Sequence, residues 1–137
     1  MKSTGKYILL LAFLAGLLTS SCNKDNGTTL TISWSSLPGT WTVTESKKKA
    51  TYEVTIRIDS ASSNGVLIRN FGGAGLDVEA IAYLSGTKLS LNSNELLTNG
   101  WIVNGTGTFT SATVISWPYT IHDGANTNTF QAVFTKK

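Results

Sequence analysis

The chain has 137 residues, which is enough for one domain of ordinary size that buries its own core without disulfides. Its formal net charge is +3, but two of the basic residues, Lys2 and Lys6, lie at the extreme N-terminus, and the rest of the chain is close to neutral. The cluster Lys47-Lys48-Lys49 is typical of a solvated hairpin loop, so nucleic-acid binding is not expected.

The first 22 residues have the pattern of a bacterial export signal. An apolar run from Tyr7 to Leu18 ends in Thr19-Ser20-Ser21 and the only cysteine, Cys22. A spanning helix needs about 20 apolar residues, so the run fits a cleaved signal peptide over residues 1–21 better than a permanent membrane span. The segment from Leu18 to Cys22 resembles the lipobox of bacterial lipoproteins, although Thr19 stands where the usual Leu would be. Secretion with ordinary cleavage and a free Cys22 is the alternative.

The lipobox resemblance implies a diacylglycerol on Cys22, and two acyl chains make a stable anchor. Asn23 follows where some inner-membrane lipoproteins carry Asp, which by resemblance favours the outer membrane, on either its periplasmic or its outer face. Residues 22–36 are expected to tether the anchored Cys22 to a domain over residues 37–137. Within them, 23–28 is predicted to be flexible, and Leu30–Trp34 is either an edge strand or an ordered approach to the domain.

The rest of the chain alternates apolar and polar residues between short turns, without sustained helical periodicity. The clearest turn signals are Asn64-Gly65 and the glycine-rich Phe71–Gly75. The pattern predicts eight strands: 41–45, 52–59, 66–70, 77–84, 88–92, 101–109, 113–121 and 129–135.

Short turns make sequential strands antiparallel, and eight strands in a meander can close on themselves and remove unpaired edges. The predicted fold is therefore all-β, a small eight-stranded antiparallel up-and-down barrel, with a two-sheet sandwich as the alternative. We expect the strand containing Pro118 to kink, because proline cannot donate to a ladder.

The segment Leu37–Trp41 contains Gly39 and Trp41 in a Gly-x-Trp pattern that resembles the opening of lipocalin-like, or calycin-like, barrels. Asn70–Gly75 and Trp101–Phe109 are similar to short lipocalin-like lipoproteins of Bacteroidetes-type bacteria. The resemblance implies that Trp41 packs across the closed end of the barrel. The sequence departs from the family pattern in two ways: the arginine that many lipocalins stack on this Trp has no counterpart, because the only basic residues in 130–137 are Lys136 and Lys137, and the lipocalin helix is missing.

A barrel of this size encloses little beyond its own side chains. The aromatic residues expected to fill it are Trp41, Tyr52, Trp101, Trp117, Phe130 and Phe134. A large interior ligand is therefore not expected.

Catalytic groups are sparse. The sole histidine, His122, adjoins Asp123 in a predicted turn, where neighbouring side chains diverge, and Cys22 is assigned to the anchor. The acids occur singly, and Asp77 and Glu79 share a face that is expected to be wet. We therefore expect no enzyme, no metal site and no cofactor.

Exposed aromatics suggest how such a domain would act. Trp34, Trp117 and Tyr119 are candidates for an outer binding face, since Trp and Tyr stack on sugar rings and anchor partners. Asp59-Ser60-Ala61 resembles an O-glycosylation acceptor of the same bacteria, which implies modification of Ser60. The predicted function is a monomeric, lipid-anchored envelope module that binds a glycan or an envelope protein. The alternatives are a carrier of a small apolar ligand inside the barrel and, by analogy only, a hydrolase-inhibitor-like barrel.

Overall fold

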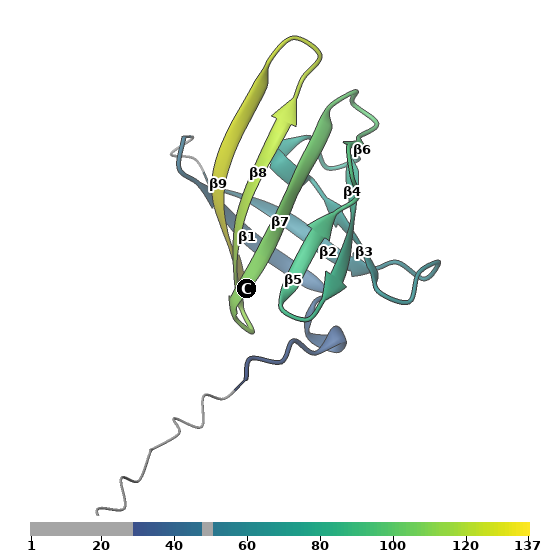
Figure 1. Cartoon of the computed structure of the whole chain (residues 1–137), viewed down its shortest axis with the longest axis vertical. Helices are drawn as coiled ribbons and strands as arrows, with labels where there is room; N and C mark the ends of the chain where they lie inside the picture. Colours follow the sequence, from purple (N-terminus) through teal and green to yellow (C-terminus); the bar gives the residue numbers. More distant parts are fainter. Residues whose placement is uncertain (1–28, 48–50) are drawn as a thin grey trace, which may run out of the picture.

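The computed structural model describes residues 29–47 and 51–137. The predicted signal peptide, Cys22, the segment 23–28 and two of the three clustered lysines lie outside the described residues. The elements follow in chain order: η1 Trp34–Ser36, β1 Gly39–Glu45, β2 Thr51–Ile58, β3 Gly65–Arg69, η2 Phe71–Gly73, β4 Glu79–Ser85, β5 Lys88–Leu91, β6 Glu95–Leu96, β7 Ile102–Ser111, β8 Val114–His122 and β9 Thr127–Lys136 (Figure 1).

The strands form one closed antiparallel barrel. Their order is β5-β4-β3-β2-β1-β9-β8-β7-β6, and β5 also pairs with β7, which joins the two ends of the sheet. The eight long strands are the eight predicted ones, so the all-β up-and-down barrel of lipocalin-like type is confirmed and the open sandwich is excluded. The additional β6 has two residues and pairs only with β7. In residues 29–47 and 51–137, no helix is long and apolar enough to cross a membrane.

Side chains alternate between the lumen and the outer face along each strand. On β8, the inward residues Ile115, Trp117, Tyr119 and Ile121 are all buried. Burial of large apolar side chains contributes about 1.5–3 kcal/mol each and is the main force that closes the barrel. Phe71 of η2 lies among them, with its ring centroid 5.2 Å from that of Trp117 and 4.8 Å from that of Tyr119.

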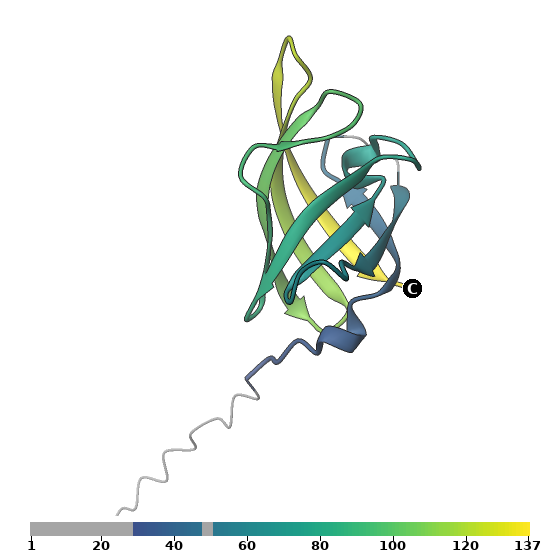
Figure 2. The ribbon, with the colours of Figure 1, turned by 90° about the vertical axis from the view of Figure 1, so that its right-hand side faces the viewer.

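The end of the barrel at which residues 29–38 enter is closed, and we call it the N-terminal end (Figure 2). Trp41 is fully buried there, and its indole Nε1 donates to the carbonyl of Leu37 at 3.1 Å. Lys136 of the last strand lies over the indole, with Nζ 5.9 Å from the ring centroid, and donates to the carbonyl of Ser36. The expectation that nothing would take the place of the lipocalin arginine is wrong, because this lysine stacks on Trp41 instead.

The segment Leu30–Trp34 forms no strand. Ile32 is buried, and Leu30 and Trp34 pack against the core from the N-terminal end. A closed barrel leaves this segment no edge to pair with, so its apolar residues pack against the barrel end instead.

Pro118 does not end β8, which continues through it and pairs Pro118 with Gln131 of β9. On the β7 side, pairing stops at Gly105↔Tyr119 and resumes at Thr108↔Ser116 in the same register. Gly105 has φ +157°, and a Cβ on it would lie 2.5 Å from the carbonyl oxygen of Pro118. The strands therefore accommodate the proline through a local loss of pairing beside a glycine.

Candidate functional site: the mouth of the barrel

The end opposite the N-terminal end is formed by residues 46–47, 70–78, 92–101 and 123–126, and we call it the mouth (Figures 1 and 2). A pocket of about 310 Å³ opens there. It is lined by Lys47, Trp101, Ile121, Asp123, Asn128 and Phe130.

The topology brings these residues together because β1, β7, β8 and β9, from which they come or which they adjoin, all start or end at the mouth. Ile121 is the last inward residue of β8 and pairs with Asn128, and Phe130 is the next inward residue on β9. Lys47 follows β1, and Trp101 precedes β7. Three apolar side chains thus line the pocket together with a cation, an anion and an amide.

Asp123 is also held by its own hairpin. Its Oδ1 accepts hydrogen bonds from the backbone N–H groups of Asn126 at 2.7 Å and Ala125 at 3.0 Å. These two bonds lower the pKa of the Asp123 carboxyl, so it stays ionised at neutral pH. His122 beside it has Nδ1 3.0 Å from Thr127 Oγ1 and is not among the residues that line the pocket.

Beneath the pocket lies a buried polar group that we call the Glu45 cluster, formed by Glu45, Tyr52 and Tyr119. The ring of Phe130 stacks on that of Tyr119 with a centroid distance of 5.3 Å, which connects the pocket lining to the cluster. Glu45 is only 2% exposed. Its Oε1 accepts a hydrogen bond from the Tyr52 hydroxyl at 2.7 Å and another from the Tyr119 hydroxyl.

Both tyrosines are donors across the physiological pH range. Burial, the largest cause, raises the pKa of Tyr119 and of Tyr52 far above the ordinary value, and the hydrogen bond to Glu45 raises both further. The two hydroxyl oxygens lie 3.2 Å apart. Two donors therefore converge on one oxygen of a single buried carboxyl group.

The second carboxyl oxygen of this group has no partner. Among buried side-chain atoms in the described part of the chain, Glu45 Oε2 and Trp117 Nε1 make no hydrogen bond. Buried polar atoms in folded proteins are nearly always paired, because an unpaired one costs about 1–3 kcal/mol.

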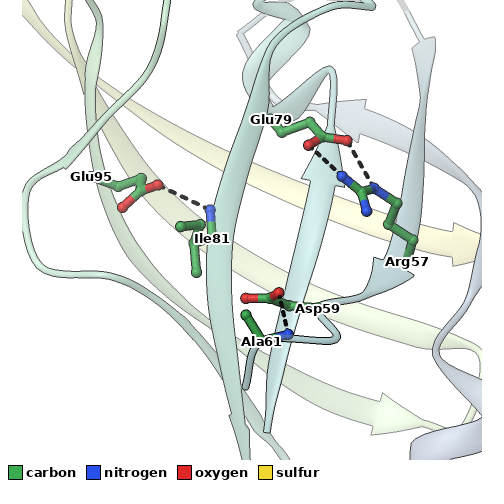
Figure 3. Close-up of polar contacts among 6 residues, drawn as sticks. All are labelled: Arg57, Asp59, Ala61, Glu79, Ile81 and Glu95. Carbon is green, nitrogen blue, oxygen red and sulfur yellow. Dashed lines mark hydrogen bonds and ion pairs between the residues drawn. The ribbon is translucent and has the colours of Figure 1, made fainter. Parts of the chain in front are cut away.

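The other buried acid, Glu95, completes the barrel wall. Its Oε1 accepts a hydrogen bond from the backbone N–H of Ile81 at 3.1 Å (Figure 3). Ladder pairing between β4 and β5 starts at Ala82↔Leu91 and does not include Ile81. The Glu95 side chain therefore accepts the hydrogen bond of the Ile81 N–H at the point where β5 ends. Glu95 is therefore a structural acid.

The remaining acids of the described residues are dispersed over the outer surface. Glu79 forms a two-point ion pair with Arg57, at 2.8 and 3.0 Å, which lowers the pKa of its carboxyl (Figure 3). Asp59 Oδ1 accepts from the backbone N–H of Ala61, and Asp77 is exposed in the loop before β4. Residues 29–47 and 51–137 contain no group of three metal-binding side chains.

The aromatic residues predicted for an outer face lie elsewhere. Trp117 and Tyr119 are inside the barrel, 0% and 2% exposed, so neither is available to a partner on the outer wall. Trp34 is half-buried against the N-terminal end. Trp101, predicted as a barrel-motif and core residue, packs half-buried against the core and also lines the pocket at the mouth. Ser60 is exposed in the turn after β2, as its predicted modification requires.

Sequence reasoning missed Glu45 as a site residue. The signal was present in β1, where Trp41, Val43 and Glu45 share the inward register of the two-residue period. An acid on a register otherwise occupied by core residues indicates a buried charge.

No protein-family model matches the chain, and no curated protein matches it. Among solved structures, the chain is similar to EF1p2_mFAP2b bound to DFHBI, with a TM-score of 0.51 and 16% identity. The similarity covers 75% of this chain and 95% of that chain. At this level of identity the similarity shows the barrel fold alone.

Proposed function

We propose that this protein binds a small, largely apolar ligand in the mouth of its barrel. The observation that carries the proposal is the pocket itself, in which Trp101, Ile121 and Phe130 are accompanied by three polar side chains. Ligand sites are typically concave and mostly apolar, with a few polar groups that fix orientation. The structurally similar EF1p2_mFAP2b is bound to DFHBI, which supports a ligand-binding role for a barrel of this fold.

The size of the pocket limits the ligand. A volume of about 310 Å³ is at the lower end of the range for small-molecule sites. Deeper in the lumen, Trp41, Trp117 and Phe134 are fully buried and fill the space. The ligand therefore belongs at the mouth and has about the size of one or two fused rings, well below the long-chain ligands that a wider barrel holds.

The lipid anchor on Cys22 and a location in the outer membrane are part of the same proposal and are supported by the sequence of residues 1–23. Residues 29–38 enter at the N-terminal end, so an anchored barrel presents its mouth away from the point where the tether arrives. A ligand can then reach the pocket from the surrounding medium.

A glycan or an envelope protein at the mouth is the second candidate. Leu76 and Leu96, at the same end, are 69% and 67% exposed and are the most exposed large apolar residues of the described chain. Half-buried Trp101 offers a ring on which a sugar could stack. A glycan array and capture of envelope proteins with the purified barrel test this candidate.

The ligand pocket is tested with 1-anilinonaphthalene-8-sulfonate, whose fluorescence rises in apolar sites. The full chain carrying Cys22→Ala is titrated without detergent and compared with the same chain carrying Trp101→Ala. Loss of the indole removes apolar contact of about 1.5–3 kcal/mol, which predicts at least tenfold weaker binding.

The matched control is Val133→Ala, on the outer face of β9, where the side chain is 44% exposed. It should leave the probe affinity within about twofold of the parent chain. Absence of saturable binding to the parent chain, or equal affinity in the Trp101 variant, would overturn the proposed site.

A further inference from the structure

We propose that the ligand of the mouth carries a positively charged nitrogen that donates a hydrogen bond to Glu45 Oε2. The protein would thus select aromatic or alicyclic amines over neutral or anionic molecules of the same shape. This inference rests on the proposed function, because the ligand enters through the pocket described above.

The hydrogen-bond donors around Glu45 are all on one side of its carboxyl group. Both donors, Tyr52 and Tyr119, bond to Oε1, and Oε2 is buried without a partner. Further hydrogen bonds to a carboxylate require a donor, and a buried charge is stabilised most by a charged one. The open hydrogen-bonding position at Glu45 thus calls for an N–H or O–H group, preferably cationic.

Within the described residues, Glu45 also has no ion-pair partner. The ion pairs of residues 29–47 and 51–137 are Arg57–Glu79 and Lys137–Glu53, and neither involves Glu45. The charged form of any buried carboxyl group is costly unless another group supplies the opposite charge. A protonated amine of the ligand meets that need.

Glu45 also lies close to the pocket along the barrel wall. Glu45 pairs with Ala132 across the β1–β9 ladder, and Ala132 is the smallest inward side chain of β9. The next inward residue toward the mouth is Phe130, which lines the pocket and stacks on Tyr119. Glu45 therefore lies one layer of side chains below the pocket, separated from it by Phe130. The proposed contact requires the Phe130 ring to move when the ligand binds.

The contrast with Glu95 shows that burial alone does not create this site. Glu95 is 8% exposed, but it belongs to the barrel wall and accepts a backbone hydrogen bond from Ile81. It is not among the buried atoms that lack a partner. Glu95→Gln is therefore the matched control for Glu45→Gln, since both replace a buried carboxylate by an amide of the same size.

The test compares three probes of one shape by calorimetry: 1-naphthylmethylamine, 1-naphthylmethanol and 1-naphthoate. In the Cys22→Ala chain we expect the amine to bind at least tenfold more tightly than the alcohol, and the carboxylate most weakly. Glu45→Gln should abolish the preference for the amine over the alcohol, and Glu95→Gln should keep the preference.

The outcomes separate the two proposals. If none of the probes binds, the proposed function fails. If all three bind with similar affinity, or if Glu45→Gln keeps the tenfold preference, the pocket stands and the role of Glu45 is refuted.

If Glu45→Gln does not fold, a second measurement on the parent chain tests whether the ligand amine contacts Glu45. With ¹³C-labelled tyrosine, the ζ-carbon resonances of Tyr52 and Tyr119 in the parent chain should shift more with the amine than with the alcohol, because the cationic amine polarises more strongly the carboxyl group that both hydroxyls contact. Tyr83, half-exposed on the outer wall, is the internal control. Identical spectra with the two probes would refute the inference.

Discussion

Replacing Tyr119 by Phe should weaken the barrel at neutral pH and make it less sensitive to alkali. The variant keeps the ring that packs against Phe71 and Phe130 and removes only the hydroxyl that donates to Glu45. A hydrogen bond to a charged group contributes about 1.5–3 kcal/mol, and Tyr52 still bonds to the same oxygen, so the expected loss at pH 7 is about 1.5 kcal/mol.

The alkaline effect follows from the raised pKa of Tyr119 in the folded barrel. In the unfolded chain a tyrosine loses its proton near pH 10, whereas the folded protein keeps it. The stabilisation linked to this proton is therefore fully present below pH 10 and is lost as the pH rises above that value. The loss amounts to at most about 1.4 kcal/mol per pH unit for this one group.

Urea unfolding followed by tryptophan fluorescence at pH 7, 10 and 11 measures both effects. Between pH 10 and pH 11 the parent chain should lose about 1 kcal/mol more than the Tyr119→Phe variant. Tyr83→Phe, on the outer wall, should change the free energy of unfolding at pH 7 by less than about 0.5 kcal/mol. Equal alkaline losses in the parent and Tyr119→Phe chains would refute the assignment of Tyr119 as a buried, protonated donor to Glu45.

Two further predictions concern the anchor and the barrel wall. Cys22→Ala should abolish the incorporation of labelled palmitate into the protein without changing its circular dichroism, and a variant that still incorporates the label would contradict lipid attachment at Cys22. Gly105→Ala should lower the free energy of unfolding by at least about 2 kcal/mol, because its Cβ would lie 2.5 Å from the Pro118 carbonyl oxygen. Gly124→Ala is the control, because Gly124 also has a positive φ but its added Cβ would meet nothing within 4 Å. Equal melting temperatures in the two variants would argue against a close contact between residue 105 and the Pro118 carbonyl oxygen.

The strands were predictable because each carries its own signal. In β2, Tyr52, Val54 and Ile56 alternate with exposed residues, and the structure keeps them on one face. The two-residue strand β6 was not predicted, because two residues are too few to show the alternation of apolar and polar side chains that marks a strand. The alternation Leu30–Trp34 suggested a strand, but a strand also needs a free edge, and whether a barrel closes is a property of the whole chain that a local pattern does not reveal.

The candidate site was less predictable, because it depends on registers between distant strands. The inward position of Glu45 follows from β1 alone, but its contacts with Tyr52 and Tyr119 require β1, β2 and β8 to be placed together. On residues 113–121, apolar side chains occupy both registers, so the sequence left Trp117 as a candidate for both the lumen and the outer face and placed Tyr119 only on the outer face. Pairing of β8 with β7 and β9 determines which of its two faces points into the lumen.

Because the barrel is closed, the mouth is the surface best suited to bind a ligand. With β5 paired to β7, the ring of eight long strands offers no free edge for strand addition. The N-terminal end is occupied by Leu37 and Trp41, both fully buried, under the incoming chain. The mouth combines a pocket, an indole at its wall and a buried carboxyl group beneath it. A tether that arrives at the opposite end leaves this surface free, so the chain's entry point and its proposed ligand site are compatible for a barrel held at a membrane.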